Sequence, residues 1–112
     1  MASIAVFRGA GIPHDTHIDY NNPGSSSIPS PSVDAIAGDL LVCLVTDDDE
    51  GQAASYTVAV GMSVAFSSNT TDYRSMIAYE LGVSAGATGA KSFAVSPNVT
   101  DRCAVSTVLS PA

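Results

Sequence analysis

Apolar residues along the chain recur with a period of two, which is the period of β-strands rather than of helices. Residues 40–46, LLVCLVT, form a continuous apolar run, as expected of a strand covered on both faces. Residues 102–109 alternate, and one side of this segment carries Cys103, Val105, Thr107 and Leu109. Residues 73–81 alternate in the same way, so we expect one face to carry Tyr73, Ser75, Ile77, Tyr79 and Leu81.

Residues 14–20 are a further expected strand, with two sides of different character. Asp15, His17 and Asp19 point to one side, whereas Thr16, Ile18 and Tyr20 point to the other, as a half-buried strand requires. Shorter apolar stretches at residues 4–7, 55–60, 62–67 and 91–95 are also expected to be strands. Turns are expected at Gly38-Asp39, at Gly61 and at residues 69–72, and residues 82–90 are expected to be a flexible loop.

These segments amount to seven or eight strands at a spacing of roughly ten residues, with no helical period between them. A parallel sheet would need crossover helices, and the sequence shows no pattern for them. We therefore predict an all-β fold for residues 1–112, a single-domain, jelly-roll-like antiparallel β-sandwich. The composition agrees, because 46% of the residues are hydrophobic and only 13% are charged, which leaves Ser, Thr, Asn and Gly to form the polar surface.

The charge of the chain argues against two classes of partner. Eleven acidic residues against four basic residues give a net charge of −7. Nucleic acid and anionic membranes attract clustered Lys and Arg, whereas the four basic residues here are scattered: Arg8, Arg74, Lys91 and Arg102. No apolar run approaches the ~18 residues of a membrane span, and the first residues do not resemble a secretory leader. We therefore expect no nucleic-acid or membrane partner, and folding in the cytosol.

Four consecutive acidic residues, 47–50, follow the apolar run and are the first candidate for a site. In an extended chain neighbouring side chains point to opposite sides, so only alternate residues such as Asp47 and Asp49 can share a divalent ion. The alternative is a charged, solvated end that keeps an apolar strand from pairing further. The contiguous spacing, unlike that of a calcium loop, favours the solvated end.

Other chemistry finds little support in the sequence. His14 and His17 fall on opposite faces of a strand, which suits a zinc site poorly, and no cysteine lies nearby. Cys43 and Cys103 both lie in apolar strand-like runs, which favours free buried thiols, with a disulfide between neighbouring strands as the alternative. No G-x-S-x-G elbow and no phosphate-binding glycine loop occur. We expect no enzymatic activity, no catalytic residues and no cofactor.

The order of three segments resembles a small β-sandwich module of bacteriophage and prophage virion proteins. They are VDAIAGDLLVCLVTDDDEG, GMSVAFSSNTTDYRSMIAYELGVSAGATG and KSFAVSPNVTDRCAVSTVLSPA, which together cover residues 33–112 apart from short gaps. In that module a Gly-Asp turn, here Gly38-Asp39, opens an apolar strand, and a mid-chain glycine is often followed by an aromatic residue. Met62 after Gly61 departs from this pattern.

The resemblance implies a virion structural protein, in particular a capsid decoration (cement) protein that binds the major capsid protein. Such proteins stabilise the head from its outer surface, commonly as homotrimers, after assembly in the host cytoplasm. The alternative is a carbohydrate-binding or receptor-binding module of a tail fibre. Sugar sites stack their ligands on exposed aromatic residues, and the four tyrosines are Tyr20, Tyr56, Tyr73 and Tyr79.

Residues 9–32 are rich in Pro, Gly and Ser and are expected to form an arm or a long loop. An extended Pro-rich segment loses little entropy on docking, which suits a segment that attaches a small domain to a shell. The residues expected to contact the capsid are the apolar and proline residues of this segment: Ile12, Pro13, Pro23, Ile28, Pro29 and Pro31.

Overall fold

The computed structural model describes residues 10–21, 25–48, 55–69, 73–99 and 101–111, and every regular element among them is a β-strand. The expected strand at residues 4–7, the residues Pro23 and Asp49, and most of the expected turn at residues 69–72 lie outside these ranges. The ten strands are β1 (Ala10–Asn21), β2 (Ser25–Ser30), β3 (Asp34–Ala35), β4 (Asp39–Asp48), β5 (Ser55–Thr57), β6 (Ser63–Asn69), β7 (Tyr73–Val83), β8 (Gly86–Ala87), β9 (Lys91–Val99) and β10 (Asp101–Pro111).

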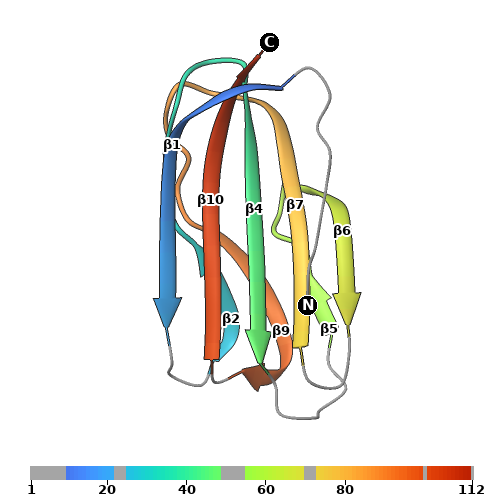
Figure 1. Ribbon diagram of the computed structural model, residues 1–112. Coiled ribbons are helices and arrows are strands. Elements are labelled where there is room, and N and C mark those ends of the chain that lie inside the picture. The colour runs from blue at the N-terminus through green and yellow to red at the C-terminus, as the bar shows by residue number, and fades with distance from the viewer. Residues whose placement is uncertain (1–9, 22–24, 49–54, 70–72, 100, 112) are drawn as a thin grey trace.

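The strands form two layers (Figure 1). The front layer in Figure 1 is a five-stranded sheet with the order β1-β10-β4-β7-β6, and a three-stranded sheet, β2-β9-β5, lies behind it. All recorded strand pairs are antiparallel, and β1 pairs with β10, β2 with β9 and β4 with β7. In a jelly roll one long antiparallel hairpin is rolled into two layers, so strands near the start of the chain pair with strands near its end. The pairs of this chain follow that arrangement. The all-β antiparallel sandwich is therefore confirmed, and two of the additional strands are the short pair β3 and β8.

The core lies between the two sheets and is built from the inward side chains of each. In β10 burial alternates strictly from Asp101 to Val108, which is the period-two signature of a strand with one buried side. Leu41 and Val45 of β4 meet Phe93 of β9 in this cluster, and each of the three is fully buried. Burying one such side chain contributes about 1.5–3 kcal/mol, so these central strands carry most of the apolar stabilisation.

The described parts of residues 9–32 are mainly β-strand, which corrects the expectation of an arm or a long loop for them. Residues 10–21 and 25–30 are strands, each at the edge of its sheet. Proline has no amide hydrogen and is tolerated in edge strands and at irregularities, which is where Pro13 and Pro29 lie. Ile28 is 1% exposed and belongs to the core, so β2 cannot detach without opening the sandwich.

Two glycines make the turns that the sequence predicted. Gly38 has a φ of 93° and Gly61 a φ of 85°, values that residues with a Cβ rarely adopt. The amide of Asp39 donates to the carbonyl of Ile36 over 3.1 Å, which closes the first turn. The segment expected to be a flexible loop, residues 82–90, is held by its pairing with residues 33–35, for example through the amide of Thr88 and the carbonyl of Val33 at 2.9 Å.

Candidate functional site

The outer face of the five-stranded sheet, which points away from the three-stranded sheet, is the main candidate site. Residues paired directly across antiparallel strands share a side of the sheet, so the register identifies this face. We use the name outer face for these residues: Thr16, Ile18 and Tyr20 of β1; Cys103, Val105, Thr107 and Leu109 of β10; Leu40, Val42, Leu44 and Thr46 of β4; and Ser75, Ile77 and Tyr79 of β7. Figure 1 looks onto this face.

The outer face is apolar because β4 and β10 carry apolar residues on both sides. In β4 the inward residues Leu41, Cys43 and Val45 alternate with outward residues that are equally apolar, Leu40, Val42 and Leu44. The outward residues of β4 and β10 are half-buried, whereas Ser75 and Ile77 of β7 are buried, so the face is only partly accessible to solvent. An antiparallel sheet with one face in water normally carries polar residues there. Here the outward residues of the two strands β4 and β10 are mostly Leu and Val, which is typical of a surface that contacts another protein.

The strand β1 presents the most exposed part of the outer face. Ile18 and Tyr20 are 69% and 68% exposed, whereas Asp15 and Asp19 on the other side of the strand are less accessible. The alternation of residues 14–20 is therefore confirmed, but its apolar side faces solvent rather than the core. The polar side is held instead by hydrogen bonds, because the carboxylate of Asp15 accepts the amide of Asp34 over 2.6 Å. This hydrogen bond lowers the pKa of Asp15.

Asp47 is buried rather than solvated, which corrects the expectation of a solvated strand end at this residue. Its Oδ1 accepts a hydrogen bond from Nε of Arg74 over 2.9 Å, and its Oδ2 forms an ion pair with a terminal nitrogen of the same guanidinium at 2.7 Å. Arg74 lies opposite it on β7 and Arg102 lies opposite it on β10, so two buried cations flank one buried anion. Both oxygens of Asp47 face Arg74, so the side chain is not placed as a ligand for a divalent ion.

Arg74 also connects the two layers. Its guanidinium carbon lies 5.2 Å from the centre of the Tyr56 ring, and Tyr56 belongs to β5 of the three-stranded sheet. A cation over an aromatic face gains about 2 kcal/mol when it is desolvated. The residues Asp47, Arg74 and Tyr56 therefore form a structural link through one end of the core rather than a site open to ligands.

A second buried carboxylate, Asp39, fixes the start of β1. Its Oδ2 accepts the amide of Ile36 over 2.7 Å and lies 2.5 Å from Nε2 of His14. Burial by itself raises the pKa of Asp39, but the hydrogen bonds from Ile36 and His14 outweigh it, so the pKa lies below its ordinary value. Figure 1 shows how β1 passes over this end of the sheet. His14 is thus a partner of the Gly38-Asp39 turn, whereas His17 lies 3.4 Å from Asp15 on the exposed strand.

The two cysteines are free and lie on opposite sides of the five-stranded sheet. Cys43 points into the core, where its sulfur lies 3.6 Å from the hydroxyl of Ser106, which in turn contacts the hydroxyl of Ser30. Desolvation raises the pKa of the Cys43 thiol, so this residue is a poor nucleophile. Cys103 belongs to the outer face, beside Tyr20. The expectation of free thiols is confirmed, although only Cys43 is fully buried.

The residues that were expected to contact a capsid differ in their exposure to solvent. Ile12 is 79% exposed and Pro13 is exposed as well, so both are available to a partner. Ile28 is part of the core and is not available, and Pro29 and Pro31 are half-buried. From the sequence alone the outer face could not be recognised as a site, because apolar residues on both sides of a strand are also typical of complete burial.

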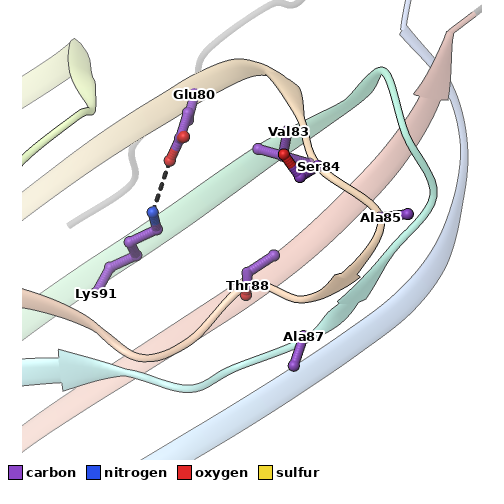
Figure 2. Close-up of a pocket in the computed structure, with 7 residues that line it drawn as sticks. All are labelled: Glu80, Val83, Ser84, Ala85, Ala87, Thr88 and Lys91. Carbon is purple, nitrogen blue, oxygen red and sulfur yellow. Dashed lines mark hydrogen bonds and ion pairs between the residues drawn. The ribbon is translucent and has the colours of Figure 1, made fainter.

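A pocket beside the turn after β7 is the second candidate (Figure 2). Its volume is about 160 Å³, and the lining residues are Glu80, Val83, Ser84, Ala85, Ala87, Thr88 and Lys91. Figure 2 shows the two charged side chains pointing toward each other, with Nζ of Lys91 2.7 Å from Oε2 of Glu80. Sites for organic ligands usually enclose ~300–1,000 Å³ and are mainly apolar. This pocket is smaller and its charges are paired, so it gives no basis for a ligand.

Within the described residues no group of three or more His, Cys, Asp or Glu side chains is placed to hold a metal ion. The part of the chain that the structure describes contains no helix long and apolar enough to span a membrane. No protein-family model matches the sequence, and neither the curated proteins nor the solved structures contain a significant match.

Proposed function

We propose that this chain is a bacteriophage virion structural protein, a capsid decoration protein that binds the major capsid protein on the outer surface of the head. The observation that carries the proposal is the outer face, where β4 and β10 present half-buried Leu and Val residues on the side away from the core. Such a surface serves contacts with protein rather than catalysis or nucleic-acid binding. The segment order of the sequence and the jelly-roll strand pairing support the proposal, since viral capsid domains use that fold.

In this proposal the start of β1 contacts the shell. Ile12 and Pro13 are exposed, and the contact of His14 with Asp39 fixes the backbone beside them. A pre-ordered apolar segment loses little entropy when it docks, which suits a clamp between capsid subunits. The domain acts as an oligomer of identical chains, so that several weak contacts add to a firm attachment.

The first test is the protein content of purified phage particles. A decoration protein is expected at a copy number comparable to that of the major capsid protein and is expected to remain with heads from which tails have been removed. Recovery only with tails, at a few copies per particle, would contradict the decoration role and support the tail-fibre alternative.

The second test uses Ile12→Asp in a co-sedimentation assay with heads that lack the protein. Loss of an apolar contact at the centre of an interface lowers affinity by roughly tenfold or more. Val60→Asp is the matched control, because Val60 is 96% exposed in the turn before Gly61 and is not part of the proposed contact. Equal binding by the two variants would remove Ile12 from the proposed contact.

The rival carbohydrate-binding function has one feature in its favour, the exposed ring of Tyr20. A glycan array with the wild-type protein and Tyr20→Ala tests it directly. Binding that disappears with the Tyr20 ring would replace the decoration role by receptor binding.

A further inference from the structure

Strand β7 is buried on both of its sides, although only one of them faces the three-stranded sheet. Residues 74–78 are all buried. Met76 and Ala78 belong to the core cluster, whereas Ser75 and Ile77 alternate with them and belong to the outer face. Ser75 and Ile77 are nevertheless only 4% and 8% exposed. The outward residues of β4 and β10 are half-buried in the same sheet, so a place inside the sheet does not explain the burial of the outer side of β7.

The side chains beside Ser75 are too small to cover it. Its partners across the strands are Thr46 of β4 and Ser68 of β6. Val105 of β10 has the larger side chain of Leu44 beside it and is still half-buried. No described strand lies in front of β7 in Figure 1, which looks onto the outer face. The cover of β7 therefore has to come from outside the described residues.

Among the longer segments outside the described ranges, residues 1–9 suit this cover best. Residues 22–24, 49–54 and 70–72 each join two described strands, and only 49–54 among them is longer than three residues. Residues 49–54, DEGQAA, are polar or small, and they lead from the five-stranded sheet to β5 in the other sheet. Residues 1–9, MASIAVFRG, contain the apolar run IAVF at 4–7 and lead into β1. An apolar run is the kind of cover that Ile77 requires.

The start of β1 brings residues 1–9 toward β7. In Figure 1 the first residues of β1 cross the upper end of β10 and β4 in the direction of β7. Ala10 pairs with Pro111, and Ile77 lies level with Val105, six residues from Pro111 along β10. The path along the sheet is therefore about 20 Å at ~3.3 Å per residue, whereas nine extended residues span about 30 Å. The segment is long enough to reach both Ile77 and Ser75.

We propose that residues 1–9 lie across the outer side of β7, with the apolar residues 4–7 covering Ser75 and Ile77. The outer face is thereby divided into two parts. The chain itself occupies β7, whereas β1, β10 and β4 remain available to a partner. Covalent attachment favours this occupant over a second copy, because it gives the segment an effective concentration in roughly the millimolar range. The division does not depend on what the partner is, so this proposal and the shell proposal can fail separately.

The first experiment measures the protection of position 75. Ser75→Cys is combined with Cys103→Ser, so that Cys43 in the core is the other thiol of the chain and serves as an unreactive control. Labelling by a maleimide is expected to be slow and to keep the same rate over a hundredfold dilution of the protein. A rate as fast as that of an exposed thiol would overturn the proposal. Protection that is lost on dilution would also overturn it, because a second copy would then supply the cover.

The second experiment places charges in residues 4–7 of this labelling variant. Alternate residues of a strand face the same side, so Ile4→Asp with Val6→Asp tests one side of the segment and Ala5→Asp with Phe7→Asp tests the other. The pair that faces β7 is expected to raise the labelling rate roughly tenfold or more.

Val60→Asp is the matched control for these charges, because Val60 is 96% exposed and lies outside the segment. All variants are checked by circular dichroism for an intact fold. A rate that neither pair changes, or that Val60→Asp raises equally, would overturn the proposal.

A third measurement uses the wild-type chain and so does not depend on the folding of a variant. Trypsin cleaves after Lys and Arg, and Arg8 lies between the apolar run and β1, whereas Arg74 and Arg102 are buried. Cleavage after Arg8 is expected to be roughly tenfold slower or more than in a synthetic peptide of residues 1–16, because the segment has to leave the sheet before the protease can bind it. Cleavage of the folded chain at the rate of the peptide would overturn the proposal.

Discussion

The substitution Asp47→Asn tests the charge of the buried carboxylate, because it removes the charge and keeps the size of the side chain. Asp47 is 2% exposed and Arg74 is 1% exposed, and a hydrogen bond of 2.9 Å and an ion-pair contact of 2.7 Å join them. The asparagine keeps the volume of the side chain but leaves the guanidinium of Arg74 buried beside a neutral partner. Arg102 lies opposite on the neighbouring strand, so the substitution also leaves two buried cations without the anion between them.

The expected loss follows from the energetics of buried ion pairs. Removing one partner of such a pair typically destabilises a protein by about 3–5 kcal/mol, because the other charge remains buried and uncompensated. A domain of this size is stable by ~5–15 kcal/mol, so the loss is a large fraction of the whole. At a urea slope of about 1.5 kcal/mol per molar, a loss of about 3 kcal/mol lowers the midpoint of unfolding by about 2 M.

Urea unfolding followed by far-ultraviolet circular dichroism measures this midpoint, since the chain contains no tryptophan for fluorescence. Asp34→Asn is the control, because Asp34 is exposed and its neutralisation should change the free energy of unfolding by less than ~0.5 kcal/mol. The pair Asp47→Leu with Arg74→Met should lose less than Asp47→Asn alone, because it leaves no charge of the pair buried. A midpoint for Asp47→Asn within about 0.3 M of the wild type would refute the reasoning.

Three further predictions concern other parts of the molecule. Because folding lowers the pKa of Asp39, the ionised carboxylate should stabilise the fold above pH 3.8, the ordinary pKa, and this stabilisation should disappear as the pH falls through the lower pKa of the folded state. The free energies of unfolding of wild type and Asp39→Asn, measured against pH, should therefore converge at low pH. A difference between them that stays constant with pH would contradict this. Ile28→Ala should lower the free energy of unfolding by about 2–5 kcal/mol, whereas Ile12→Ala should change it by less than ~0.5 kcal/mol; equal losses in urea unfolding would mean that β2 is not part of the core. Gly38→Ala should lower the thermal midpoint through a backbone strain of about 1–2 kcal/mol at a φ of 93°, and an unchanged midpoint would show that the turn adapts.

The sequence predicted most of the strands but missed β2 and the first residues of β1, for a physical reason. The apolar rhythm of residues 40–46 and 102–109 is local and follows directly from the pleat of a strand. The strands β1 and β2 contain Pro and Gly that normally interrupt strands, and they form because their partners β10 and β9 lie far along the chain. Edge positions tolerate proline, but the position of a strand within a sheet cannot be read from its own residues.

The burial of Asp47 could not be predicted from the sequence for a similar reason, because its partner is distant in the chain. Within the acidic run it looks like its neighbours, and the run as a whole is typical of a solvated end. Its partner Arg74 is far away in sequence, and only the antiparallel register of β4 with β7 brings the two together. The outer face follows from the sequence only in part. The alternation predicts that Cys103, Val105, Thr107 and Leu109 share one side of the strand, but it does not predict whether that side is covered.

The pairing of β1 with β10 has a consequence for the synthesis of the protein. Strand β10 lies between β1 and β4, so an internal strand of the five-stranded sheet is supplied by residues 101–111, near the end of the chain. Until those residues leave the ribosome, β1 and β4 have no neighbour on the sides that face each other, and a nascent chain exposes both as open edges. Folding must therefore be completed after translation of the last strand, which makes the unfinished chain a client for chaperones and any truncation before residue 101 prone to aggregation.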